Sequence, residues 1–155
     1  MDDQQLKVRY LTVNFVGLAM VISVFLYAVV VEVLKRVYAP FTGFAGLDPS
    51  QTQILKYIFV ALAIGHFFLI KIIQKVLTSG SIERLFQAAI ATLALCEAVA
   101  IFGLVLFLLA GNSMNFYLFM FLSLFYFWFF FPKYQDWEAQ RRAQSSPDKK
   151  KVSNQ

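Results

Sequence analysis

Two side chains that can carry a proton lie deep inside apolar stretches of this sequence. Glu97 lies near the middle of the apolar stretch 82–110, and His66, the only histidine, lies near the middle of the stretch 54–76. A carboxylate at the centre of a bilayer costs about 2.5–3.5 kcal/mol on insertion scales, so such a residue is normally retained for a function. Two interpretations of Glu97 follow: a carrier of protons or cations, or a protonated side chain hydrogen-bonded to a neighbouring helix.

The positions of these two residues predict that they lie at similar depth. His66 comes 12 residues before Thr78, and Glu97 comes 15 residues after Ile82, on the two sides of a short connection. At 1.5 Å per residue their depths differ by about 4–5 Å, which allows a hydrogen bond if their helix faces meet. A Glu97–His66 proton relay is one hypothesis. A neutral His66 bonded to a backbone carbonyl is the alternative.

A metal site is not expected. One histidine, one cysteine and one central glutamate do not supply a convincing set of ligands for a metal ion. Cys96 adjoins Glu97 but points about 100° away from it around the helix, which favours a role as a small buried hydrophobic residue. We therefore expect neither a metal nor another cofactor.

Small residues at helical spacing flank both polar side chains. They are Ala61 and Gly65 on one helix, and Ala91, Ala94 and Ala98 on the other. In lipid, such residues let two helix backbones approach closely. We expect the second and third helices to dock along these faces, with the two polar side chains near the contact.

The composition shows which kind of chain must position these residues. Of 155 residues, 59% are hydrophobic and only 15% are charged, and the mean hydropathy is +0.64. A typical soluble domain has roughly 45–50% apolar and about 25% charged residues. A single cysteine also excludes a disulfide framework. We predict a polytopic membrane protein, whose net charge of +5 reports its orientation and not a nucleic-acid partner.

Four segments are long and apolar enough to cross a bilayer. They cover about residues 10–34, 54–76, 82–110 and 114–131, with Gly111 suited to end the third and Ser113 suited to cap the fourth. Short connections force neighbouring helices to be antiparallel, so we predict an all-α four-helix transmembrane domain over residues 1–131. Residues 132–155 form a basic tail, in which 133–144 can be an interfacial helix and 145–155 are expected to be disordered.

The fourth segment is aromatic and carries Ser123 as its one small residue after the cap. Eight of the 18 phenylalanines lie within it. Because it lacks a small-residue face, we expect this helix to be peripheral, exposed to lipid or clasped by a partner subunit.

The basic residues predict the orientation of the chain. Eleven lie on the side of the N-terminus, the second-to-third connection and the tail: Lys7, Arg9, Lys71, Lys75, Arg84, Lys133, Arg141, Arg142, Lys149, Lys150 and Lys151. Three lie on the other side: Lys35, Arg36 and Lys56. We expect both termini in the cytoplasm, and an arrangement that suits a bacterial inner membrane.

The segment 94–105, which reads Ala-Leu-Cys-Glu-Ala-Val-Ala-Ile-Phe-Gly-Leu-Val, resembles the ion-binding helix of the c-subunits, or proteolipids, of rotary ATPases. In that family a carboxylate is followed by a small residue and an Ile-aromatic-Gly-Leu run. The resemblance implies that Glu97 carries the ion and couples its flow to rotation of a ring. The sequence departs from the family in its second helix, where Gly65 is the only glycine, and in its loop, which has Glu83-Arg84 in place of Arg followed by Gln or Asn and Pro.

Three functions are compatible with these features. The first is a non-catalytic accessory or assembly subunit of a larger membrane complex, with Glu97 as a polar contact at the midplane. The second is a proteolipid-like subunit that translocates protons through Glu97. The third is a small four-helix membrane enzyme of the glutathione- and eicosanoid-metabolising class, for which we find no nucleophile–base pair and no polar cluster at a helix end. The expected partners are the bilayer and other membrane subunits or further copies of the chain.

Overall fold

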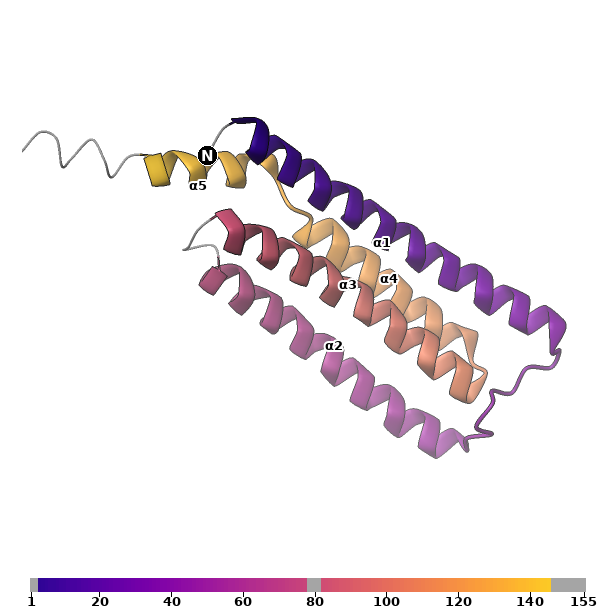
Figure 1. Ribbon diagram of the computed structural model, residues 1–155. Helices are drawn as coiled ribbons and strands as arrows, with labels where there is room; N and C mark the ends of the chain where they lie inside the picture. Colours follow the sequence, from indigo (N-terminus) through magenta and orange to yellow (C-terminus); the bar gives the residue numbers. More distant parts are fainter. Residues whose placement is uncertain (1–2, 78–81, 146–155) are drawn as a thin grey trace, which may run out of the picture.

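The computed structural model describes residues 3–77 and 82–145, and all regular structure in these residues is helical (Figure 1). The helices are α1 (Asp3–Val37), α2 (Pro49–Leu77), α3 (Ile82–Ala110), α4 (Ser113–Phe130) and α5 (Tyr134–Ser145). The first four are long and apolar enough to cross a membrane. The chain therefore has the all-α architecture of a small multi-pass membrane protein, as predicted. The expectations for residues 78–81 and 146–155 lie outside the described residues.

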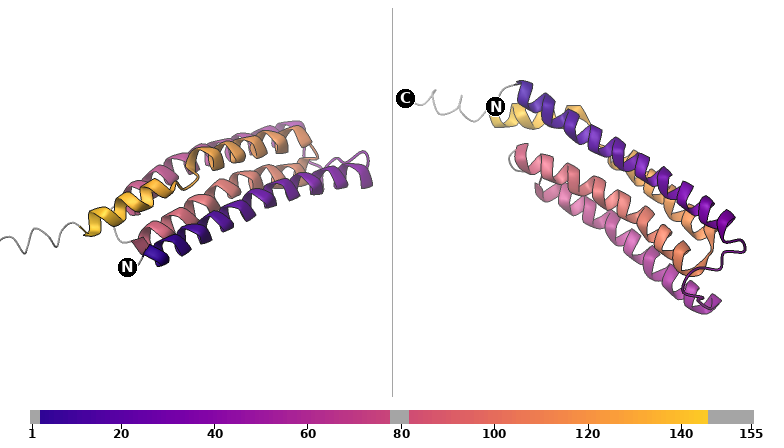
Figure 2. Two further views of the ribbon diagram at one scale, coloured as in Figure 1. Left: turned by 90° about the horizontal axis from the view of Figure 1, so that it is seen from above. Right: turned by 45° about the vertical axis from the view of Figure 1, so that its right-hand side comes forward.

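Helix α3 is the central element of the bundle. It packs most extensively against α4, and then against α2 and α1, whereas α1 and α4 touch each other less. Figure 2 shows two layers, with α1 beside α3 in one and α2 beside α4 in the other. Helix α2 precedes α3 in the chain and α4 follows it, and both run antiparallel to α3 (Figure 1). Side chains on different faces of α3 therefore meet three different helices.

The ends of the helices follow from local capping residues. Pro49 opens α2, and the Gln51 side chain reaches back to accept a hydrogen bond from Asp48 N at 3.2 Å, as in half of a capping box. Gly111, with φ +72°, ends α3 as predicted. The cap of α4 differs from the prediction. Asn112 and not Ser113 caps it, because Asn112 Oδ1 accepts from Met114 N at 3.0 Å.

The expectation that α4 is peripheral is wrong, because α4 buries the largest share of its span. The space for close packing comes from α3. A methyl group at Gly103 would lie 2.6 Å from Phe119 Cβ and 3.0 Å from Phe116 O. Along the same contact, Ser123 Oγ donates a hydrogen bond to Cys96 O at 2.7 Å. The bulky residues of α4 therefore need no small-residue face of their own.

The segment 38–48 between α1 and α2 covers the carboxyl end of α3. Phe44 N donates to Leu108 O at 2.8 Å, and Ala45 N donates to Leu109 O at 3.3 Å. The last four carbonyl groups of a helix have no partner within the helix, so these bonds satisfy two of them. We call this end of the bundle, which also holds the α3–α4 turn, the loop end, and the opposite end the terminal end.

Helix α5 follows the transmembrane domain and packs against its terminal end. Trp137 is buried, and its ring lies 6.0 Å from that of Tyr10 on α1. Tyr134 also meets Tyr10 edge to face, with ring centroids 5.0 Å apart. The first part of the basic tail is thus a helix, and aromatic contacts hold it against α1.

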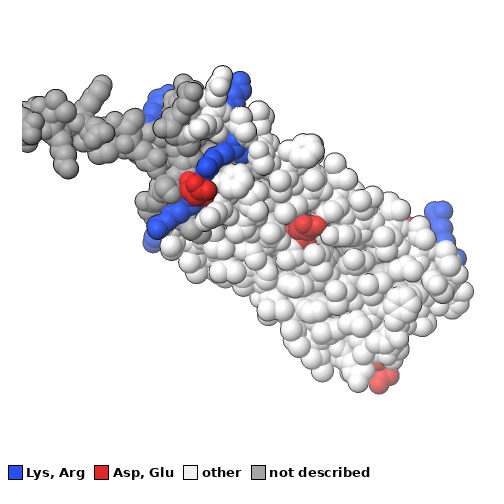
Figure 3. Space-filling model, in the orientation of Figure 1, with Lys and Arg blue, Asp and Glu red and all other residues white. Residues whose placement is uncertain are grey.

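The charged side chains gather at the two ends of the molecule. Figure 3 shows basic groups at both ends of an otherwise largely uncharged face, with one acidic group about half way along it. At the terminal end, Arg9 of α1 pairs with Glu83 of α3 at 3.3 Å. This distribution is the one expected for a body surrounded by hydrocarbon between two polar boundaries.

Candidate functional site

Glu97 lies half-buried near the middle of α3 and faces α1. Tyr27 donates a hydrogen bond to Glu97 Oε1 at 2.7 Å, and Ser23 Oγ is hydrogen-bonded to the same oxygen. Ser23 and Tyr27 are one helical turn apart, so their hydroxyl groups share a face of α1. We call these three residues the Glu97 cluster. It places a polar contact between two helices in the middle of the apolar body.

Ser23 Oγ makes a second hydrogen bond, to the backbone carbonyl of Met20 at 2.7 Å. A hydroxyl group can take part in more than one hydrogen bond, through its hydrogen and its two lone pairs. Ser23 therefore lies between the backbone of its own helix and the carboxyl group of Glu97, and the cluster joins α1 to α3.

His66 is not a member of this cluster. Its Nδ1 donates to Leu62 O, four residues earlier on α2, at 2.8 Å, and its ring meets Phe102 of α3 edge to face at 5.3 Å. The hydrogen bonds of Glu97 go to α1, so the structure does not bring the expected Glu97–His66 pair together. The reason is rotational: Phe102 and Glu97 are five positions apart, which turns them about 140° from each other around α3.

The small residues are not where the sequence placed them. Ala61, Gly65 and Ala94 are exposed, and Ala91 and Ala98 are half-buried. Contact between α2 and its neighbours instead runs through the opposite face of α2. There Ala63 is buried, and Phe59 stacks on Phe102 at 5.3 Å. The expectation that α2 docks on α3 along Ala61 and Gly65 is therefore wrong, because that pair faces outward.

Ser23 and Tyr27 were not predicted as partners of Glu97. Both lie inside the first apolar stretch, at a spacing of four, and two hydroxyl groups on one helix face were the available signal. The sequence alone does not say which neighbouring helix that face meets. The packing of α1 beside α3 supplies this information.

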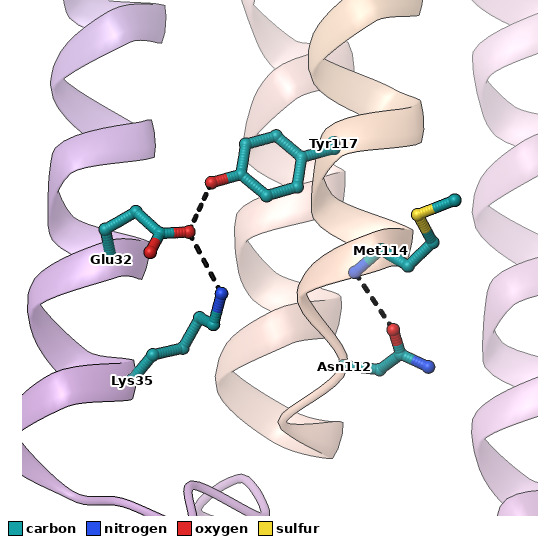
Figure 4. Close-up of polar contacts among 5 residues, drawn as sticks. All are labelled: Glu32, Lys35, Asn112, Met114 and Tyr117. Atoms are coloured by element: carbon teal, nitrogen blue, oxygen red, sulfur yellow. Dashed lines mark hydrogen bonds and ion pairs between the residues drawn. The ribbon is translucent and has the colours of Figure 1, made fainter.

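A second polar contact joins α1 and α4 near the loop end (Figure 4). Tyr117 donates to Glu32 Oε1 at 2.5 Å, and Lys35 Nζ lies 3.1 Å from the same oxygen. The pair Glu32–Lys35 is the local ion pair that its spacing of three favours. Because one carboxylate is shared by a cation and a phenol from another helix, this contact fixes the position of α1 against α4.

A cavity of about 200 Å³ opens at the terminal end. Its lining includes Thr92 of α3, Lys133 just before α5, and Trp137 of α5. Thr92 is buried, and its hydroxyl group has no hydrogen-bond partner among the described residues. A buried hydroxyl in this state is satisfied when a water molecule or ligand fills the space beside it.

The described residues contain no candidate metal site. Within residues 3–77 and 82–145, no three His, Cys, Asp or Glu side chains gather closely enough to hold a metal ion. Cys96 is fully buried, so its thiol group packs inside the bundle.

No protein-family model matches the chain. No curated protein and no solved structure matches it significantly either. The candidate functional features are therefore two arrangements of its own side chains: the Glu97 cluster between α1 and α3, and the outward face of α2.

Proposed function

We propose that this chain is a non-catalytic subunit of a larger membrane assembly, and that the outward face of α2 contacts a helix of that assembly. The observation that carries the proposal is the exposed pair Ala61 and Gly65, one helical turn apart. A methyl group at Gly65 would meet nothing within 4 Å. The backbone of α2 is therefore open to close approach from outside this chain.

The surroundings of this pair support the same role. Helix α2 buries the smallest share of its span among the four apolar helices of the described residues. Between Lys56 and Lys71 it carries no charged side chain. Lipid offers no hydrophobic reason for helices to associate, so small residues that allow backbone contact promote association. Within residues 3–77 and 82–145 the pair makes no such contact, which leaves it available to another subunit.

Enlarging the pair should weaken the assembly. We expect Ala61→Leu with Gly65→Leu to lower the recovery of companion subunits by about fivefold or more, equivalent to ~1 kcal/mol of helix association. The measurement is quantitative mass spectrometry of the tagged full chain after gentle solubilisation. Ala19→Leu is the matched control, since Ala19 is also exposed but lies on α1. If wild type elutes alone, or if both variants retain their companions equally, the proposal fails.

The Glu97 cluster favours a second candidate, a subunit that handles protons. It places a carboxyl group half-way along a transmembrane helix, where two hydroxyl groups of α1 bond to it. A carboxyl that is neutral in lipid and ionises beside a polar partner is the element that proton carriers use. The resemblance of residues 94–105 to the ion-binding helix of rotary ATPase c-subunits supports this candidate. His66 lies outside the cluster, so a relay would run through Tyr27 and Ser23.

A hydrophobic carbodiimide tests this candidate, because the reagent attacks protonated carboxyl groups within membranes. We expect Glu97 to be modified in the full chain and Glu97→Gln to abolish the labelling, as read by peptide mass spectrometry. In liposomes, Glu97→Gln should also abolish the decay of an imposed pH gradient. An unlabelled Glu97, or a gradient that decays equally fast in both proteins, would reject proton handling and leave the assembly proposal standing.

A further inference from the structure

A polar cavity of about 400 Å³ lies at the loop end, between the first turns of α2 and the start of α4. Its polar lining comes from Thr52, Gln53 and Lys56 on α2 and from Asn112 and Asn115 at the start of α4. A water molecule takes up about 30 Å³ of liquid, so the cavity has room for a substantial group. Its volume also falls in the roughly 300–1,000 Å³ range of small-molecule sites.

Two of these groups have no side-chain partner among the described residues. Asn115 is only 7% exposed, yet its side-chain amide makes no hydrogen bond to any described residue. Lys56 is half-buried and forms no ion pair within the described residues. Gln53, another lining residue, already has a partner, because its Nε2 donates a hydrogen bond to the hydroxyl group of Tyr57 at 3.1 Å. The side chains of Asn115 and Lys56 both line the cavity, so both can bond to a group that enters it.

The donors of this cavity match a negatively charged oxygen group. Lys56 supplies a full positive charge, and no carboxylate is among the described residues that line the cavity. The start of α4 adds the positive end of a helix dipole, at Asn115. Asn112 uses its Oδ1 to cap α4, and its amide nitrogen points away from that backbone (Figure 4). The cavity therefore presents donors and no acidic competitor.

We propose that this cavity binds a phosphate group, carried either by a lipid head group or by a small polar solute. Lys56 holds the charge, and the amide of Asn115 donates to an oxygen of the same group. Lys56 lies only two residues inside the apolar stretch that begins at about residue 54, which is the depth of the membrane boundary. The site is separate from the outward face of α2 and from the Glu97 cluster, so it does not depend on the function proposed above.

The test uses the full chain, delipidated in a non-ionic detergent, with two probes. Phosphatidylglycerol presents a phosphate on a lipid, and inorganic phosphate presents the same chemistry as a free solute. Binding is read by native mass spectrometry for the lipid and by thermal unfolding for both probes, with zwitterionic phosphatidylcholine as the reference. A preference for phosphatidylglycerol alone identifies a lipid site, and saturable stabilisation by inorganic phosphate identifies a solute site.

Two variants assign the binding to this cavity. Lys56→Gln removes the ammonium group, and we expect about a tenfold or greater loss of affinity for whichever probe binds. Asn115→Asp keeps the side-chain shape but places a negative charge against the ligand. An aspartate in the first turn of α4 suits the helix dipole, so this variant should remain folded while its affinity falls. Arg36→Gln is the matched control, because it removes a cation from the same end of the bundle outside the cavity.

The binding results either support or overturn the proposed phosphate site. Binding that falls in Lys56→Gln and Asn115→Asp but not in Arg36→Gln supports the site. Equal binding by wild type and Lys56→Gln places the ligand elsewhere and overturns it. Failure of both probes to bind the wild-type chain also overturns it, because both carry the group that the cavity is proposed to recognise.

Discussion

Replacing Gly103 with alanine is expected to push α3 and α4 apart and to lower the free energy of unfolding by about 1–3 kcal/mol. The added methyl group would lie 2.6 Å from Phe119 Cβ and 3.0 Å from the backbone oxygen of Phe116. Neither atom is the far end of a flexible side chain, so the contact is relieved only when one helix moves. Because α3 is the centre of the bundle, this movement also disturbs its contacts with α1 and α2.

Gly65 provides the control for this experiment. It also lies inside an apolar helix, but a methyl group there meets nothing within 4 Å. Gly65→Ala is therefore expected to keep or raise stability by up to about 1 kcal/mol through helix propensity alone. Thermal or denaturant unfolding of the purified chain in detergent, followed by circular dichroism, compares the two variants. Equal stability of Gly103→Ala and Gly65→Ala would contradict the close α3–α4 packing described here.

Replacing Gly111 with alanine is expected to cost about 2–4 kcal/mol, because conformation and space both oppose it. Gly111 has φ +72°, a region that side-chain-bearing residues rarely adopt. Its methyl group would also lie 2.5 Å from Phe41 O and 2.7 Å from Gly43 N, which are backbone atoms of the α1–α2 segment. The variant should therefore detach that segment from the carboxyl end of α3.

A substitution at Gly46 distinguishes the conformational cost from the steric cost. It also has a positive φ, +56°, but a methyl group there meets nothing within 4 Å. Gly46→Ala should thus lose only the conformational share, about 1 kcal/mol. Hydrogen exchange at Phe44 N and Ala45 N, which bond to α3, reports whether the segment has detached. These two amides are expected to exchange faster in Gly111→Ala than in Gly46→Ala. Equal exchange rates would contradict the close packing of Gly111 against the α1–α2 segment.

The presence of four apolar helices was predictable because it depends on local features. Apolar stretches longer than a bilayer require helices, since lipid leaves no other partner for the backbone. Gly111 and Pro49 mark boundaries through their own backbone chemistry, and the structure places both at helix ends. The cap of α4 was displaced by one residue, because Asn112 and Ser113 are both suitable caps and geometry selects between them.

The burial of α4 shows why helix-by-helix reasoning has a limit. Its own sequence is bulky and predicted a peripheral position, yet it lies closest to the central helix. Close packing requires a small residue on only one of the two partners, and Gly103 of α3 supplies it to Phe119. A property shared by two helices cannot be read from either one alone.

The sequence by itself determined that the chain has four apolar helices and that one carboxyl group lies near the middle of the third. These are properties of single segments, set by hydrophobicity, length and capping. Only the tertiary structure decided that Glu97 meets Ser23 and Tyr27 and not His66, and that Ala61 and Gly65 face outward. A helix turns by about 100° per residue, so a modest rotation changes every partner of a side chain, and only the joint packing of all the helices sets that rotation.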